Sequence, residues 1–353
     1  MARARVTIRD VAEAAGVSAT TVSHALNGKG EVSPATIERV RAAARRLGYR
    51  PSPTARALRQ GRNGALVLIL PREDGREVAR QIVALDYYMA IAATAASVAF
   101  EHQRALILPP ELTTAEDWES INPDGVLLCD PIASDPQIEL LESIGIPVVS
   151  IERDAGRPDR VHYVAGDNTA NTRLVLAHLR EQGARRIALL TTAWTRAWSI
   201  DIDDAYSAWC AETGFPDLRV RVPVQFDNRA AYQAACHLLD GPEPPDAIYA
   251  PAEGYTNGAL TACRERGLRI PQDVLVVGGI DGREARESEP AVTALDLHPD
   301  RQAAAAVHLL IDRIDGRDAQ GPIQVPSTLQ VRASSTRRSV TQLPETPDTN
   351  ESG

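Results

Sequence analysis

Short polar side chains gather between residues 18 and 27, among few bulky groups. The hydroxyls of Thr20 and Thr21 can donate or accept hydrogen bonds, and the imidazole of His24 can donate to the acceptors on guanine. These groups suit the edges of DNA bases, whereas a solvated surface histidine is the plain alternative for His24. The segment is therefore a candidate for reading DNA sequence.

A second chemically active group follows the apolar run 186–191. Trp194 and Trp198 flank Arg196, in a chain that has only 4 Trp. Two indoles beside a guanidinium predict a stacking wall with a charged anchor for a small molecule. The alternative is that both indoles only pack between lobes of the protein.

Signatures of catalysis are missing from the sequence. There is no GxGxxG after the first strand, no Walker loop, no GxSxG and no metal-spaced His or Cys group, and the seven His are dispersed. We expect no enzyme activity, no metal site and no cofactor. An enzyme with a DNA-binding appendage remains the rival hypothesis, which an assay for product formation from a bound ligand would decide.

The charge is divided unevenly along the chain. Residues 1–62 hold eleven Arg and one Lys against four acids, a net charge of +8, although the whole chain carries −9. The remaining residues therefore carry −17. A basic head on an acidic body predicts that the head binds phosphate groups of a nucleic acid.

Three short helices are predicted within residues 6–48. Thr7 and Asp10 suit the start of the first, Gly16 ends it, and Ser18 suits the start of the second. In that second helix an apolar side of Val22, Ala25 and Leu26 leaves outward Ala19, Thr20, Ser23, His24 and Asn27. Two helices around a glycine turn predict a helix-turn-helix whose second helix enters the major groove. A three-helix module that contacts protein is the alternative.

From residue 65 onward, short continuous apolar runs alternate with amphipathic helical stretches. This pattern predicts an α/β fold with parallel sheets covered on both faces, arranged as two doubly wound lobes. We divide the chain into a helix-turn-helix domain (1–50), a Pro- and Gly-punctuated hinge (51–63), a two-lobed body (64–334) and a disordered tail (335–353). Lobe 1 is expected at about 64–162 plus 292–320, and lobe 2 at about 163–291 plus 321–334.

The predicted location is the cytoplasm. Four scattered cysteines form no CxxC pair, and the first ten residues contain no apolar secretory segment. The longest apolar run, 89–100, is far shorter than the roughly 20 residues that span a bilayer. We expect no membrane association.

The first 60 residues resemble the lac repressor (LacI/GalR) family. The resemblance rests on the run from Thr7 to Ser18, the segment 20–24, Asn27, Val32-Ser-Pro and the stretch 47–58. Looser signatures continue through the body, at Ile146-Pro-Val-Val, Asp167-Asn, Arg185-Arg-Ile, Asp246-Ala, and Ile270-Pro-Gln-Asp into Val276-Val-Gly.

The resemblance implies a homodimer that reads a pseudopalindromic operator in double-stranded DNA. The base-reading positions would be Ala19, Thr20 and His24, and the hinge would become a helix on DNA, with Leu58 wedged in the minor groove. An apolar dimer contact is the alternative for Leu58. The full set of expected DNA-binding residues is Thr7, Ser18, Ala19, Thr20, Thr21, Ser23, His24, Asn27, Arg50, Arg56 and Leu58.

For the body, the resemblance implies a periplasmic-binding-protein-like core that holds a small-molecule effector between its lobes. The expected effector-binding residues are Tyr87, Tyr88, Trp194, Arg196, Glu253 and Asp281. Ile202 and Ile280 stand where many relatives have polar ligand-binding residues, and Glu253 stands where Asp is usual. Four classes of effector stay open: a simple sugar, a modified sugar, a nucleobase-like compound and an anion held by Arg196. An alternative function also stays open, in which the protein binds DNA constitutively and its sensor is vestigial. No leucine heptads follow residue 335, so a dimer is favoured over a tetramer.

Overall fold

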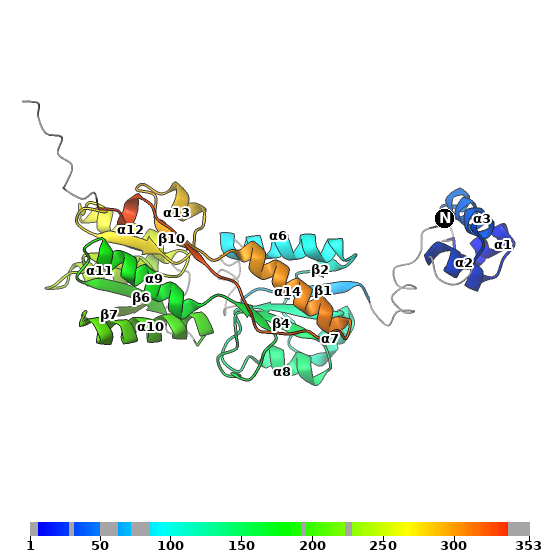
Figure 1. The fold of residues 1–353 in the computed structure, drawn as a ribbon, viewed down its shortest axis with the longest axis horizontal. Coiled ribbons are helices and arrows are strands. Elements are labelled where there is room, and N and C mark those ends of the chain that lie inside the picture. The colour runs from blue at the N-terminus through cyan, green and yellow to red at the C-terminus, as the bar shows by residue number, and fades with distance from the viewer. Residues whose placement is uncertain are drawn as a thin grey trace, which may run out of the picture. The chain divides into compact units, whose positions relative to one another are not determined.

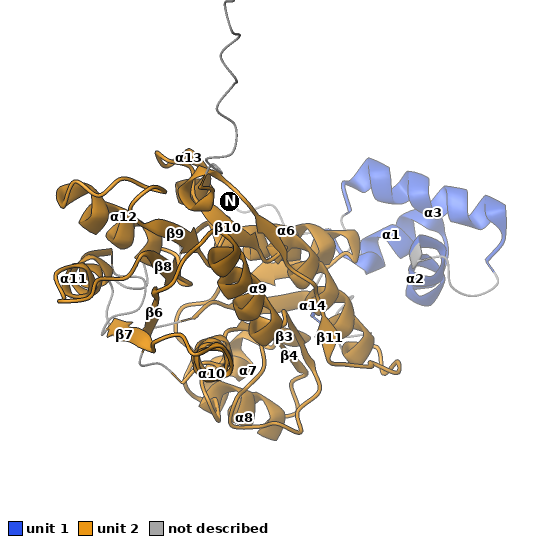
Figure 2. Ribbon diagram, turned by 60° about the vertical axis from the view of Figure 1, so that its left-hand side comes forward, with its two compact units in different colours: residues 1–64 blue, residues 65–353 orange. Residues whose placement is uncertain are grey.

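The computed structural model describes residues 6–27, 32–49, 63–71, 85–192, 195–222 and 228–337. They form two compact units, a head within residues 1–64 and a body within residues 65–353, which Figure 2 distinguishes by colour. No helix in these ranges is long and apolar enough to cross a membrane.

The head consists of three helices, as the sequence predicts: α1 (Ile8–Ala15), α2 (Ala19–Asn27) and α3 (Pro34–Leu47). The carboxylate of Asp10 accepts hydrogen bonds from the amide (2.7 Å) and the hydroxyl (2.9 Å) of Thr7 at the start of α1. Gly16 ends α1 at a φ of 66°, in the left-handed region that favours glycine. The three helices close around a small apolar core formed by Val11, Ala12, Val22, Ala25, Val40, Ala43 and Ala44.

The first sheet of the body has the strand order β11-β5-β4-β3-β1-β2, with all strand pairs parallel. Its strands are β1 (Ala65–Ile69), β2 (Ala105–Ile107), β3 (Gly125–Cys129), β4 (Val148–Ile151), β5 (Tyr163–Ala165) and β11 (Ile323–Gln324). Its helices are α6 (Asp86–Glu101), α7 (Ala115–Ile121), α8 (Pro136–Ser143) and α14 (Pro299–Ile314).

Alternate residues of β1 show that both faces of this sheet are covered. Leu66 and Leu68 join the apolar cluster of α6 and α14, whereas Val67 joins that of α7 and α8. Figure 1 shows α6 and α14 on one side of this sheet and α7 and α8 on the other. A strand buried on both faces needs an unbroken apolar run, which is why these strands were recognisable in the sequence.

The second sheet has the order β12-β10-β9-β8-β6-β7, and only the β10–β12 pair is antiparallel. Its strands are β6 (Ile187–Thr192), β7 (Leu218–Val222), β8 (Ala247–Ala250), β9 (Leu275–Gly278), β10 (Thr293–Asp296) and β12 (Thr328–Gln330). Its helices are α9 (Asn168–Glu181) and α10 (Ala197–Thr213) on one face, and α11 (Asn228–Leu239) and α12 (Tyr255–Glu265) on the other. The short helices α13 (Arg283–Glu287) and η1 (Ala333–Ser335) complete the lobe.

The chain crosses between the lobes at positions that differ from those expected. Strand β5 and strand β11 pair with each other in lobe 1, although residues 163–165 and 323–324 were expected in lobe 2. Strand β10 belongs to the sheet of lobe 2, although residues from 292 onward were expected in lobe 1. Strands of two to four residues are too short to carry a hydrophobic pattern, so pairing with existing sheet edges decides their place.

The body also extends past the expected start of the tail. Ser335 is fully buried, and its hydroxyl lies 2.7 Å from Nε2 of His178 and donates to Thr293 Oγ1 at 2.6 Å. These bonds hold η1 in lobe 2, so the disordered tail cannot start at residue 335. The segment 338–353 lies outside the described residues.

Tyr206 joins three elements of lobe 2 and offers a test of this packing. Its fully buried hydroxyl donates to the Ile187 carbonyl (2.6 Å) and accepts from the Leu218 amide (3.1 Å). Tyr206→Phe should lower the free energy of unfolding by about 1–3 kcal/mol, because a buried partner loses its hydrogen bond. Thermal unfolding followed by circular dichroism measures this, and an unchanged midpoint would contradict the packing.

Candidate functional site

Helix α2 presents an exposed polar face beside the turn that separates it from α1. Ser18 begins the helix, and its Oγ accepts from the Thr21 amide at 3.1 Å. Ala19, Thr20 and His24 are exposed, and Thr21 is half-buried. The two helices and the glycine turn have the helix-turn-helix order, so the exposed side chains lie where a recognition helix meets base edges.

Ser23 is a correction to the expected outward set. Only 6% of Ser23 is exposed, because α2 packs against both α1 and α3. The buried side of α2 is therefore wide and includes Val22, Ser23 and Ala25. A side chain in this position supports the head's core rather than meeting a base edge. Thr7, in contrast, is exposed at the start of α1, with its hydroxyl donated to Asp10.

Several expected positions lie outside the described residues. They are the side chain of Asn27, the hinge residues Arg50, Arg56 and Leu58, and Trp194 in the loop after β6. Their roles stay predictions.

The body contains a cavity between its two lobes, at the carboxyl ends of both sheets. Its volume is about 60 Å³, whereas one water needs about 10–15 Å³ on such a measure. The walls come from the segments after β3, β4, β8 and β9 and from the first turns of α6, α9 and α10. The lining residues are Tyr87, Tyr88, Asp130, Glu152, Asn168, Asn171, Trp198, Ile202, Tyr249, Pro251, Ala252, Gly279, Ile280, Leu295 and Leu297.

Two buried carboxyl groups face this cavity. Burial raises the pKa of Asp130, while Arg196 and the hydroxyl of Tyr88 act in the opposite direction. Burial, followed by the charge of Asp130, raises the pKa of Glu152 to about 8, although Asn168 donates to it at 3.2 Å. Glu152 is therefore predominantly protonated at neutral pH in the empty protein.

The two expected tyrosines both line the cavity and are held by lobe 1. The hydroxyl of Tyr87 donates to Gln302 Oε1 on α14 (2.7 Å), and that of Tyr88 donates to the carboxylate of Asp130. The two rings meet edge to face with centroids 5.2 Å apart. Both rings are fixed by these contacts, which gives the cavity a preformed aromatic wall.

Three other expected residues lie near the cavity without lining it. The buried guanidinium of Arg196 donates to the main-chain carbonyl of Asp130 and so joins lobe 2 to lobe 1. Glu253, nine-tenths buried, accepts from the Asp86 amide across the lobes at 3.1 Å, and burial raises its pKa to about 7. Asp281 forms ion pairs with Arg332 (2.8 Å) and Arg286 (3.5 Å). These residues therefore connect the lobes or brace lobe 2.

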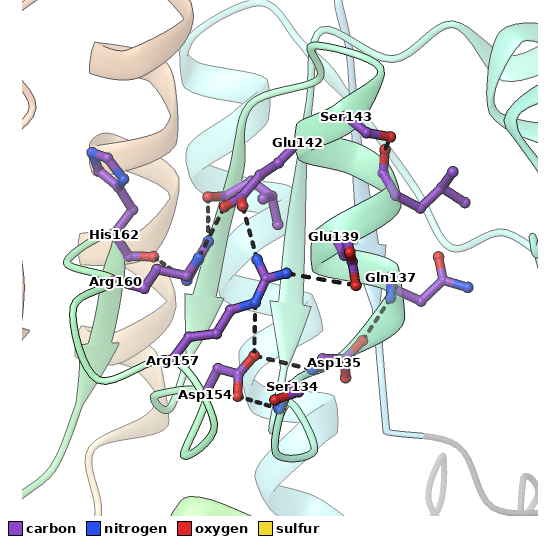
Figure 3. Close-up of polar contacts among 12 residues, drawn as sticks. Ser134, Asp135, Gln137, Glu139, Glu142, Ser143, Asp154, Arg157, Arg160 and His162 are labelled. Carbon is purple, nitrogen blue, oxygen red and sulfur yellow. Dashed lines mark hydrogen bonds and ion pairs between the residues drawn. The ribbon is translucent and has the colours of Figure 1, made fainter.

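The lobe 1 loop that meets Arg196 is held by buried carboxylates. Asp154, 1% exposed, accepts from the amides of Ser134 (2.7 Å) and Asp135 (3.0 Å), and Arg157 pairs with Glu142 at 2.9 Å (Figure 3). This loop then contacts lobe 2, because the Ala133 amide donates to the Thr195 carbonyl at 3.1 Å. These hydrogen bonds and this ion pair fix the lobe 1 side of the contact between the lobes.

Sequence reasoning did not select Asp130, Glu152, Asn168, Asn171 or Tyr249 as binding residues. The signal that points to the first three is their place, since Asp130 and Glu152 directly follow β3 and β4 and Asn168 begins α9. Ligands of open α/β folds bind beyond the carboxyl ends of the strands. Asn171 and Tyr249 carry no such signal, because they come from within a helix and a strand.

Comparisons with known proteins match both the helix-turn-helix head and the two-lobed body. Residues 7–52 match the model of bacterial regulatory proteins of the lacI family, and residues 176–335 match a periplasmic binding protein-like domain. The transcriptional regulator CelR of Thermobifida fusca is 30% identical over 341 residues, covering 94% of this chain and 99% of its own. The chain belongs to the lacI family. The transcriptional repressor PurR of Erwinia tasmaniensis is also 30% identical, over 93% of this chain and 96% of the relative.

Solved structures of the lacI family share the fold. A CelR–cellobiose complex has a TM-score of 0.68 at 28% identity and covers 94% of this chain and all of that one. A lac repressor dimer bound to operator and the anti-inducer ONPF has a TM-score of 0.81 at 22% identity, over 95% of this chain and all of that one. Like these regulators, this lacI-family chain is a DNA-binding transcriptional regulator, and its named relatives are regulators rather than enzymes.

The raised pKa of Glu152 predicts a pH-dependent effect on stability. Its folded-state value of about 8 lies above the ordinary 4.5, so its contribution to stability declines as pH rises between these values. Glu152→Gln copies the neutral form, so it should change little at pH 5 and stabilise by on the order of 1–3 kcal/mol at pH 8.5.

Thermal unfolding of both proteins at the two pH values measures this difference. Glu212→Gln is the matched control, because Glu212 is exposed, pairs with Arg173 at 2.6 Å and has a lowered pKa. An equal midpoint for Glu152→Gln and the unaltered protein at pH 8.5 would show that Glu152 is not kept neutral by burial.

Proposed function

We propose that this chain is a ligand-controlled regulator that binds a pseudopalindromic operator as a homodimer in the bacterial cytoplasm. The observation that carries the proposal is that one chain combines an exposed helix-turn-helix face with an interlobe cavity, whose mainly apolar wall also contains polar groups. A cavity lined by carboxyl, amide and phenol groups is an expected feature of a sensor, and it disfavours the constitutive binder with a vestigial sensor.

In the head, Ala19, Thr20 and His24 contact base edges, while Ser18 and Thr21 support the start of α2 and its approach to phosphates. Exposure of the first three supports this assignment. Arg50 and Arg56 contact phosphates, and Leu58 enters the minor groove, as the resemblance implies. The basic charge of residues 1–62 supplies the attraction, so operator affinity should fall steeply with salt.

In the body, the ligand binds between the lobes and changes their closure. Tyr87 and Tyr88 contact it directly, and Arg196, Glu253 and Asp281 hold the lobes in the bound arrangement. Trp194 lies outside the described residues and keeps the stacking role predicted from the sequence. The polar bonds from Arg196 to Asp130 and from Glu253 to Asp86 support this division of roles. Relatives of this chain include a regulator with a cellobiose complex, which favours a sugar or a related metabolite as the ligand.

The outer face of α6 supports the homodimer. Met89, Ala93, Ala96 and Phe100 follow one another at helical spacing and are all exposed, Met89 by 40% and Phe100 by 81%. Leu108, 50% exposed, lies just after the edge strand β2 of the same lobe. An apolar stripe on an otherwise polar surface marks a protein interface, and a second copy of the chain is the partner that a pseudopalindrome requires.

The DNA-reading role is tested by selecting random DNA with the purified full-length protein at about 150 mM salt. We expect a palindrome with a flexible central step, weakened about 10-fold or more by Leu58→Ala. His24→Ala should change the preferred bases at specific half-site positions. Ser23→Ala and the exposed control Glu38→Ala should leave the selected sequence unaltered, and selection of no sequence at all would refute the proposal.

The dimer is tested by Phe100→Glu, which places a charge in the apolar stripe of α6. Desolvating an unpaired carboxylate is costly, so the dimer dissociation constant should rise by at least about 10-fold. Sedimentation velocity at several protein concentrations measures it, with Glu101→Gln at the same helix end as the control. A dimer of unchanged affinity would place the interface elsewhere.

A further inference from the structure

The charged groups that line the interlobe cavity are all acidic. Asp130 and Glu152 are its two ionisable acids, and among the described lining residues there is no Arg, Lys or His. Both carboxyl groups are more than nine-tenths buried, at 5% and 6% exposure. A cavity of this kind repels an anionic ligand, so the anionic metabolite left open by the sequence is disfavoured.

The cations nearest to the cavity already interact with other groups. Arg196 donates to the main-chain carbonyl of Asp130 and offsets part of the charge on that side chain. Arg153 forms an ion pair with Asp201 on α10. The charges that act on Glu152 come from Asp130 and Asp201, which are both acidic. Glu152 is therefore a buried carboxyl group whose ionised form lacks a compensating cation.

Aromatic rings form much of the remaining wall. Tyr87, Tyr88, Trp198 and Tyr249 all line the cavity, from a chain that has only 8 Tyr and 4 Trp. Aromatic faces attract cations, and rings grouped around a small site are a known way to bind ammonium groups. Ile202 and Ile280 also line the cavity and offer no hydrogen bond to sugar hydroxyls, whereas Asn168 and Asn171 supply amide groups.

We propose that the effector carries an ammonium group, which pairs with the carboxylate of Glu152 inside this aromatic wall. The inference rests on the proposed function, in which the cavity holds the effector, and it adds the chemical class of that ligand. An amino sugar or another small amine has the required charge, whereas a neutral sugar supplies no cation to pair with the carboxylate of Glu152. Binding converts Glu152 from its neutral to its ionised form and releases its proton to solvent.

The proton release gives the proposal a pH signature. Glu152 is neutral below about pH 8 in the empty protein, so a permanently charged ligand should bind more tightly as pH rises towards that value. Asp130, Asp201 and Tyr87 also act on Glu152, while Arg196 and Arg153 are engaged by Asp130 and Asp201. Replacing Glu152 alone by Gln should therefore abolish most of the pH dependence.

The test compares small ammonium probes with neutral molecules of matched shape, using the full-length protein. Choline is paired with 3,3-dimethylbutan-1-ol, and glucosamine with glucose, because small probes suit a cavity of about 60 Å³. Isothermal titration calorimetry at pH 6 and pH 8.5 measures each dissociation constant. We expect choline to bind at least about 10-fold more tightly than its neutral partner, and more tightly at pH 8.5 than at pH 6. Glucosamine should bind more tightly than glucose at pH 6, where its amino group is charged.

Variants assign the effect to the cavity. Glu152→Gln should bring the ratio between choline and its neutral partner close to one, whereas Glu212→Gln, on the exposed pair with Arg173, should leave it unchanged. The proposal is overturned if no ammonium probe binds better than its neutral partner, or if the preference persists in Glu152→Gln. Operator selection by the same protein preparation separates this inference from the proposed function. If the ammonium test fails but the protein still selects an operator sequence, only the inference about the ligand is removed.

Discussion

The backbone of the body crosses between its two sheets three times, after β5, after β10 and after β11. The crossings after β5 and β11 are tied together, since the Val325 amide donates to the Ala165 carbonyl (2.9 Å) and Asn171 donates to Ser327 (3.1 Å). They hold the lobes so that the carboxyl ends of both parallel sheets line one cavity. The aromatic wall, the buried acids and the polar contacts between the lobes all depend on this arrangement.

Several polar contacts among the described residues join an element of lobe 1 to an element of lobe 2 beside the cavity. Arg196 reaches the carbonyl of Asp130, and Glu253 reaches the amide of Asp86. We propose that these contacts change when the lobes open or close. A ligand that binds both lobes therefore shifts the balance between two arrangements by its differential affinity for them. Linkage then requires that DNA and ligand affect each other's binding equally.

Much of this architecture could be predicted from the sequence. The three head helices are marked by local signals at Thr7, Gly16 and Ser18, and the long buried strands are unbroken apolar runs. The lobe boundaries could not be predicted correctly, because β5 and β11 are only two or three residues long and their places depend on pairing across the sheet. Ser23 was misassigned for a related reason, since packing of α2 against two helices widens its buried side beyond a simple helical pattern.

In the candidate ligand site, too, some residues could be predicted from the local sequence, whereas others depend on contacts between distant segments. Tyr87 and Tyr88 were predicted at the start of the helix after β1, where they line the cavity. Arg196 was predicted as a charged anchor for the ligand, with an anion as one of the open alternatives, but it donates to a main-chain carbonyl 66 residues away in sequence. The acidic character of the cavity likewise comes from Asp130 and Glu152, which are neighbours only because β3 and β4 pair in parallel.

The most direct test of the account is the operator affinity of Arg196→Ala without any ligand. Arg196 belongs to the body unit and joins its two lobes, so its replacement tests whether the arrangement of the lobes affects DNA binding. The account predicts that the operator dissociation constant shifts by at least about fivefold, in the range typical of allosteric coupling, while the dimer and the folded state persist. An unchanged operator affinity in a folded, dimeric variant would contradict the claim that lobe closure controls DNA binding.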